Sequence, residues 1–258
     1  MAYNKEDKRI LNRLGYYEYQ QGLIYRHLNQ DKGWNSHLEN CRNFILKSVE
    51  MISPSKVTIL GSGWLLDIPL RELLDKTGSV VLVDIVQPPE AVKQVSGFRQ
   101  VSVMESDVTG GLVREVWEKA GKIPFWKKLN TIGNISIPEF SFGEDPGLVI
   151  SVNVLSQLHV LPERFLRKKS RTKEAEFIKF RKEVQEKHMN LLLKHKSVII
   201  TDICENFTGR DGKKTLVKTV EVEIPEGSYT RRWTWDFDLR RSDYYEKKSV
   251  LEVIASVL

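Results

Sequence analysis

The chain has 258 residues, of which 41% are hydrophobic, and a modest excess of cations, with 40 Lys and Arg against 34 Asp and Glu. Its length allows one large hydrophobic core. Two cysteines without a CxxC neighbour exclude a disulfide framework and a cysteine-based zinc site. The polar residues 1–8 predict no secretory signal, and no apolar run approaches the roughly 20 residues of a membrane span, so we expect a cytoplasmic protein.

The N-terminal region is expected to be helical from about residue 5 to residue 50. Apolar residues recur there at intervals of three and four, in two pieces separated by Lys32 and Gly33. These helices alone are too few to bury their own apolar faces, so they must pack against the rest of the chain. The sequence therefore predicts an N-terminal helical cap over residues 1–52 and a main domain over residues 53–258.

Apolar strands and helices alternate after the cap. We expect strands at about 57–61, 80–84, 99–104, 148–153 and 197–202. Helices are expected from Asp67, as N-cap, through Leu74, at 112–121, and at 163–195 with a break near Ser170, while 124–146 is irregular. Strand-like segments follow at 216–224, 229–237 and 249–258. This order predicts an α/β fold with a mostly parallel, seven-stranded sheet and an antiparallel edge.

The strongest motif is the apolar run that ends in Gly61-Ser62-Gly63, followed about twenty residues later by a second apolar run that ends in Asp84. Such glycines let the backbone turn sharply near a ligand, and the acid accepts hydrogen bonds from a ribose diol. The pattern indicates the opening of a βαβ nucleotide-binding unit. Leu66 replaces the third glycine of the dinucleotide fingerprint and no Tyr-x-x-x-Lys pair is evident, which disfavours a nicotinamide-dependent oxidoreductase.

Over residues 40–258 the chain resembles the class I (Rossmann-like) S-adenosylmethionine-dependent methyltransferases. Residues 57–63 look like the family's first motif, Asp84 like its ribose-binding acid, and Asp107 with Val108 like the acid that contacts the adenine amino group. The segment 148–158 is similar to the fourth motif, which lines the cofactor and substrate mouth. The resemblance implies S-adenosylmethionine as cofactor, held by Gly61, Ser62, Gly63, Trp64, Asp84, Ile85, Asp107, Val108 and Asn153.

Two positions depart from this family pattern. The acid that usually stands two residues before the first glycine is Ile59 here, and the family's third glycine is Leu65. The methionine amino group of the cofactor therefore lacks one standard partner. Asp67 could take that place if the turn carries it over the pocket, but the pattern favours Asp67 as a helix cap.

Candidates for catalysis and for substrate binding are weaker. Asn153, Gln157 and His159 follow the 148–153 strand, where open α/β sheets bind ligands, although a lone histidine in an apolar run is more often packed. Trp34 and His37 are candidates to cover the pocket, or to anchor the helices to the sheet. No metal site is predicted. Aromatic residues in 124–146 suggest a small, partly apolar acceptor.

Rival functions remain open. The altered first motif favours a non-catalytic scaffold that binds cofactor or a protein. Residues 163–188 carry ten Lys and Arg against five Glu, and the 164–187 stretch is either a solvated helix surface or a phosphate track of an RNA methyltransferase. Trp233 and Trp235 alternate on one face of a strand, where they pack against the sheet or offer a stacking platform for a base.

Overall fold

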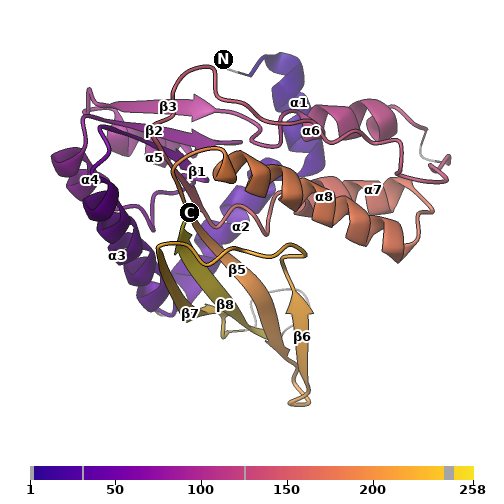
Figure 1. The fold of residues 1–258 in the computed structure, drawn as a ribbon. Helices are drawn as coiled ribbons and strands as arrows, with labels where there is room; N and C mark the ends of the chain where they lie inside the picture. The colour runs from indigo at the N-terminus through magenta and orange to yellow at the C-terminus, as the bar shows by residue number, and fades with distance from the viewer. Residues whose placement is uncertain (1–2, 31, 125, 241–246) are drawn as a thin grey trace.

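The computed structural model describes residues 3–30, 32–124, 126–240 and 247–258. These residues form one sheet of eight strands in the order β3-β2-β1-β4-β5-β8-β7, with β6 paired to β5 off this path (Figure 1). Five strands are parallel: β1 (Lys56–Leu60), β2 (Ser79–Asp84), β3 (Val101–Glu105), β4 (Leu148–Val152) and β5 (Ser197–Thr208). The other three, β6 (Lys214–Lys218), β7 (Tyr229–Asp238) and β8 (Lys248–Val257), pair antiparallel. The predicted Rossmann-like α/β fold is confirmed.

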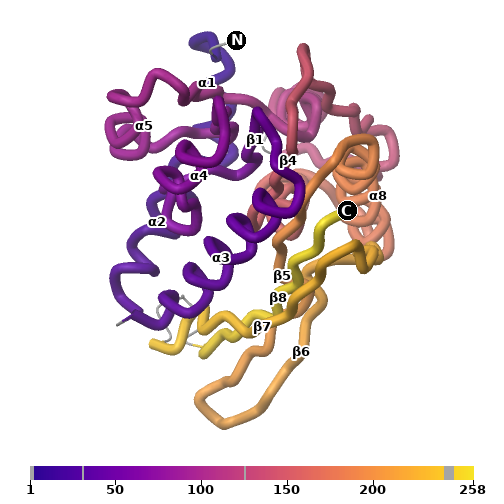
Figure 2. The backbone as a smooth tube through the Cα atoms, turned by 60° about the vertical axis from the view of Figure 1, so that its left-hand side comes forward, coloured from indigo at the N-terminus to yellow at the C-terminus, as the bar shows by residue number. Residues whose placement is uncertain are grey.

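The expectation of seven strands was wrong, since each of the eight strand-like segments contributes a strand to the sheet. β5 is twice as long as the six residues predicted. Its outer half, 204–208, pairs with β6 in a hairpin that projects beyond the sheet (Figure 2). The strand expected at 216–224 ends at Lys218. Beyond it the side chain of Gln185 binds the backbone, donating to the Thr219 carbonyl at 2.9 Å and accepting the Glu221 N–H at 2.7 Å. A helix side chain thus replaces the neighbouring strand that 219–224 would need.

The helices lie near their predicted positions, except that the helix after β2, at 89–95, was not predicted and the helix after β1 starts later than expected. They are α1 (Lys5–Leu14), α2 (Tyr16–Asn29), α3 (Asn35–Ile52), α4 (Leu70–Lys76), α5 (Pro89–Val95), α6 (Leu112–Val116) with a π-helical turn η1 (Trp117–Gly121), α7 (Val160–Lys169) and α8 (Glu174–Leu193). The last two are separated at Ser170, as predicted. The helix expected from Asp67 instead begins at Leu70, with Pro69 as N-cap and no side-chain cap.

The strand period of two divides the apolar residues between two faces of the sheet. On β1, Val57 and Ile59 pack on the side of α3, whereas Leu60 packs on the side of α8. Figure 2 shows α3 and α8 on opposite sides of the strands. A third cluster joins α1 to α6, α7 and α8. The N-terminal helices are therefore fixed in two places, α3 against the sheet and α1 against the helices after β3 and β4.

Among the described residues, none of the helices is long and apolar enough to cross a bilayer.

Candidate functional site

A cavity of about 180 Å³ opens at the carboxyl ends of the parallel strands. The strand order sets four of its lining residues in a row at this edge: Asp107 after β3, Asp84 on β2, Gly61 after β1 and Asn153 after β4. Neighbouring strands lie about 5 Å apart, so the row matches an extended ligand. All nine residues predicted to hold the cofactor line this cavity: Gly61, Ser62, Gly63, Trp64, Asp84, Ile85, Asp107, Val108 and Asn153.

Gly61 is required at the end of β1 by both its conformation and its neighbours. Its φ of +85° lies in the left-handed region, and a Cβ there would stand 2.1 Å from Val154 Cγ2 and 2.6 Å from the Val152 carbonyl oxygen. Its N–H donates to the Val83 carbonyl at 2.9 Å, which ties the turn to β2. Leu65, where the family has a glycine, also has a positive φ, 61°. The turn therefore keeps its shape at Leu65 at a backbone cost of roughly 1–2 kcal/mol.

Asp84 is held at the end of β2 by backbone and side-chain donors. The Gly63 N–H donates to Oδ2 at 2.8 Å, and the Val86 N–H donates to Oδ1 at 3.4 Å. Gln20 Nε2 from α2 donates to Oδ1 at 3.3 Å. Burial raises the pKa of Asp84 to about 6, although these donors oppose the rise. The side chain is thus an acceptor in the cavity wall with no cationic partner at salt-bridge distance among the described residues.

Asp107 is bound by the segment that follows it. The Thr109 N–H donates to Oδ1 at 3.0 Å and the Thr109 hydroxyl donates to the same oxygen, while the Val113 N–H donates to Oδ2 at 3.1 Å. These contacts tie the turn after β3 to the start of α6. Burial raises the pKa of Asp107. A carboxylate oxygen accepts up to two hydrogen bonds, so Oδ2 still offers an acceptor position to a ligand.

Asp67 lines the cavity rather than capping a helix, so the interpretation that the sequence favoured was wrong. Its Oδ2 accepts from Asn153 Nδ2 at 2.9 Å. The N-cap of α4 is Pro69, two residues later than predicted, and Asp67 lies in the turn before the helix. Burial raises the pKa of Asp67 to about 6. Asn153 itself has a positive φ of 52°, and its Oδ1 is buried without a hydrogen-bond partner among the described residues.

His37, Cys41 and Asp67 bring three ligand-type atoms within 4.8 Å of one another, a grouping that the sequence did not predict. However, Trp233 Nε1 donates to His37 Nδ1 at 3.1 Å. An indole nitrogen is only a donor, so the neutral His37 ring carries its proton on Nε2. That nitrogen, 3.5 Å from Cys41 Sγ, then has no lone pair for a metal ion. The geometry favours a hydrogen-bonded chain over a metal centre.

The weaker candidates divide between cavity and core. Trp34, His37 and Gln157 line the cavity, but His159 does not. His159 is buried, its Nδ1 has no hydrogen-bond partner among the described residues, and burial lowers its pKa to about 3. It is therefore placed as a packed histidine. Trp34 also anchors α3 to β7, because its Nε1 donates to the Phe237 carbonyl at 2.9 Å.

Sequence reasoning missed the part of the wall that comes from distant segments. α2 contributes Tyr16, Tyr19 and Gln20, and β7 contributes Trp235. Gln20 joins α2 to the glycine turn, since Trp64 Nε1 donates to its carbonyl at 3.0 Å. Trp235 stacks on His37 with ring centroids 3.8 Å apart, and Trp233 contacts the same histidine, so the predicted shared face is confirmed. No local pattern marks a glutamine on α2 as a neighbour of β2.

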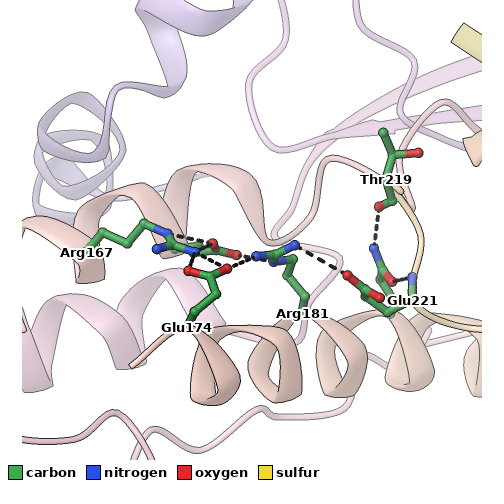
Figure 3. Close-up of polar contacts among 7 residues, drawn as sticks. Arg167, Glu174, Arg181, Thr219 and Glu221 are labelled. Atoms are coloured by element: carbon green, nitrogen blue, oxygen red, sulfur yellow. Dashed lines mark hydrogen bonds and ion pairs between the residues drawn. The ribbon is translucent and has the colours of Figure 1, made fainter. Parts of the chain in front are cut away.

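Two arginines of the basic stretch 164–187 belong to a network of acids. Arg181 contacts Glu163 at 3.0 Å and Glu174 at 2.7 Å, and Arg167 contacts both of these acids as well. Figure 3 shows Arg181 between Glu174 and Glu221, whose carboxylate lies 3.4 Å away. This network joins α7, α8 and the segment after β6. Arg167 and Arg181 with their glutamates thus form an internal staple, whereas Lys168 and Arg171 form no ion pair among the described residues.

No family model and no curated protein sequence matches the chain. Among solved structures it is similar to the N-methyltransferase NodS of Bradyrhizobium japonicum with S-adenosyl-L-homocysteine, at 11% identity and a TM-score of 0.37, over 92% of this chain and 97% of that chain. It is also similar to 1,6-didemethyltoxoflavin-N1-methyltransferase of Burkholderia thailandensis, at 11% identity and a TM-score of 0.40, over 100% and 92%. A third similar structure is that of a putative RNA methyltransferase of Pyrococcus horikoshii, at 10% identity and a TM-score of 0.34, over 85% of this chain and 83% of that chain. Similarity at this level carries no argument about activity.

Proposed function

We propose that the protein is an S-adenosylmethionine-dependent methyltransferase that acts on a small, partly apolar acceptor. The observation that carries this proposal is the row of Asp107, Asp84, the Gly61 turn and Asn153 within one cavity. Acceptors for an adenine amino group and a ribose diol stand in the order in which a nucleoside presents them. Binding in the crevice outside the carboxyl ends of the strands is the general rule for open α/β sheets.

Each part of the row has a separate task in this proposal. The turn after β3, with Asp107 and Val108, receives the adenine, and Asp84 receives the ribose. The Gly61 turn lets the backbone approach the ligand because it has no Cβ. The amino-acid portion then extends toward Asn153. When bound, the cofactor supplies a methyl group on a sulfonium, so this chain needs chiefly to align an acceptor lone pair with the carbon–sulfur bond.

The acceptor side of the cavity lies beyond β4, among Gln157, Leu158, Leu161, Trp34 and Trp235. These side chains are mostly apolar or aromatic, which supports a partly apolar acceptor. None of these five side chains is an ionisable base, which is compatible with the reaction because an acceptor that is already nucleophilic needs little proton transfer. Gln157 Nε2 donates to the Asn153 carbonyl at 2.7 Å and so braces the turn after β4.

Arg167 and Arg181 are paired with glutamates, so an RNA phosphate track on this stretch would depend on cations outside that network, such as Lys168 and Arg171. Charge reversal at Lys168, Lys169 and Arg171 should leave RNA retention unchanged at low salt. Loss of a salt-sensitive RNA affinity in that variant would instead favour the RNA methyltransferase.

The test of the cofactor is calorimetric titration with S-adenosylmethionine, S-adenosylhomocysteine and NAD, on the parent protein and on Asp84→Ala. We expect binding of the two sulfur ligands and its loss in the variant. Asp75→Ala, which removes an exposed carboxylate on α4, is the matched control and should bind as the parent does. Binding of no ligand would leave the scaffold hypothesis, and binding of NAD alone would indicate an oxidoreductase.

A further inference from the structure

The charges of the cavity are unbalanced. Asp67, Asp84 and Asp107 line it, and no lysine or arginine is found among the described lining residues. Its histidine, His37, is neutral, because burial lowers its pKa to about 3. Buried carboxylates without cationic partners are costly unless a ligand compensates them. The cavity is therefore built for a ligand that brings positive charge.

The three carboxylates stand at different places along the row. Asp107 and Asp84 belong to β3 and β2, and both accept backbone N–H groups from their own surroundings. Asp67 lies at the other end, bound to Asn153 at the end of β4. Ile59, at the position where an acid would be expected before the glycine turn, is fully buried in the core on the α3 side. Among the described lining residues, Asp67 is thus the one with a carboxylate at the β1–β4 end of the cavity.

We propose that Asp67 binds the α-ammonium group of the cofactor's amino-acid portion, in place of an acid at position 59. This inference rests on the proposed function, because the order of adenine and ribose along β3 and β2 directs the amino-acid portion toward β1 and β4. An ammonium ion that leaves water needs a counter-charge, and the Asp67 carboxylate is the one that the turn presents there. Asn153 Nδ2 orients it through Oδ2 and leaves its remaining acceptor positions for the ligand.

A row of buried polar side chains lies behind Asp67. Trp233 donates to His37, and His37 Nε2 lies 3.2 Å from Asn153 Nδ2. Two donors do not bond each other, and Asn153 Oδ1 has no partner among the described residues. Exchange of the Asn153 amide atoms would let the His37 Nε2–H donate to Oδ1, and Asp67 in its protonated form could then donate to the same oxygen. The amide orientation is thereby coupled to the charge of Asp67.

The experiment compares two ligands that differ in the amino-acid portion. S-Adenosylhomocysteine carries the ammonium, whereas methylthioadenosine keeps the adenosine and lacks the amino acid. In Asp67→Asn we expect the affinity for S-adenosylhomocysteine to fall about 30-fold or more, which is typical for loss of one partner of a buried charge pair. The affinity for methylthioadenosine should stay within about two-fold. Asp75→Asn removes the same charge from the surface and is the matched control.

The pH dependence gives a second readout on the parent protein. Between about pH 7 and pH 5, Asp67 gains a proton, because its pKa is raised to about 6. The other groups that face it keep their state: His37 is neutral, the pKa of the Cys41 thiol is raised by burial, and the Arg42 guanidinium is always charged. Asp84 titrates in the same range but acts on both ligands. The ratio of the two affinities should therefore fall with pH in the parent and stay constant in Asp67→Asn.

Two results would overturn the assignment of Asp67 and leave the proposed function standing. One is an equal loss of both ligands in Asp67→Asn, which would mean that Asp67 only shapes the cavity. The other is an unchanged affinity for S-adenosylhomocysteine in an Asp67→Asn variant that unfolds at or above the parent's temperature. If the parent protein itself binds neither ligand, the proposed function fails and the assignment of Asp67 fails with it.

Discussion

The acids of the cavity and those of the α7–α8 pair differ in whether basic side chains pair with them. In the cavity, burial raises the pKa of Asp67 and of Asp84 to about 6; the Arg42 charge opposes this rise at Asp67 only in part, and no lysine or arginine is among the described lining residues. In the helix pair, hydrogen bonds from Arg167 lower the pKa of Glu174, and Glu163 is held by two arginines. Uncompensated acids lower stability and leave free energy for a ligand to recover, whereas paired acids lock helices together. The contrast separates a site from a staple.

The largest expected effect comes from closing the cavity at its turn. Gly61→Val should weaken binding of S-adenosylhomocysteine more than about 100-fold, because the side chain meets Val154 and the Val152 carbonyl at a φ that favours glycine. Calorimetry on folded protein measures the loss. Gly143→Ala is the control, since nothing lies within 4 Å of a Cβ there. Undiminished binding in the Gly61 variant would remove the cavity as the site.

A substitution in the staple should lower the stability of the protein and leave its affinity for the ligand unchanged. Arg181→Met is expected to lower the free energy of unfolding by about 2 kcal/mol, because it leaves the buried Glu163 with one of its two arginines. Affinity for S-adenosylhomocysteine should stay within about two-fold. Lys182→Met, which breaks an exposed i,i+4 contact with Glu186, should cost less than about 0.5 kcal/mol. Denaturant unfolding measures both variants, and a binding defect in the first would contradict the division into site and staple.

A smaller effect of opposite sign is expected in the cavity. Asp67→Asn should raise the free energy of unfolding at about pH 7.5 by about 1 kcal/mol, even while it weakens ligand binding. The pKa of Asp67 is raised from 3.8 to about 6 in the folded state, so the folded protein binds this proton more tightly than the unfolded chain does. The contribution of Asp67 to the free energy of unfolding of the parent therefore falls as the pH rises from about 4 to 6. Above about pH 6 the difference in this free energy between the parent and Asp67→Asn is constant. The advantage of the variant should vanish near pH 4. A variant less stable than the parent at pH 7.5 would contradict the uncompensated charge.

Much of the fold was predictable because strands β1 to β4 are short apolar runs bounded by turn residues. Val57 and Leu60 alternate between two faces, and the glycine turn and Asp84 end two such runs. These are local patterns, and the strand order then brings their ends together at one edge. The predicted cofactor residues line one cavity for this reason, although their roles stay predictions, as does the division at residue 52.

The rest of the site depends on contacts between distant segments. Asp67 followed by Pro69 reads locally as a helix start, and only the tertiary position of β4, with Asn153, shows where its carboxylate points. Gln20 meets Asp84 across 64 positions of the chain. The end of the strand before 219–224 likewise depends on Gln185 of α8, and the outer half of β5 depends on its pairing with β6 and β8. A sequence pattern of period two or 3.6 carries no information about such partners.

The smallest effect tests whether the histidine of the cavity is a fixed donor. Trp233→Phe removes the N–H that occupies His37 Nδ1, at a cost of about 1 kcal/mol or less. Nitrogen chemical shifts of the ring should show the proton on Nε2 in the parent and a mixture of tautomers in the variant. Co²⁺ should then gain affinity in the variant, because Nε2 acquires a lone pair beside Cys41 and Asp67. If the ring of the parent protein is protonated on Nδ1 instead, Nε2 is free to bind a metal ion beside Cys41 and Asp67. A metal ion there would compensate the acids of the cavity, and the contrast with the staple would lose its basis.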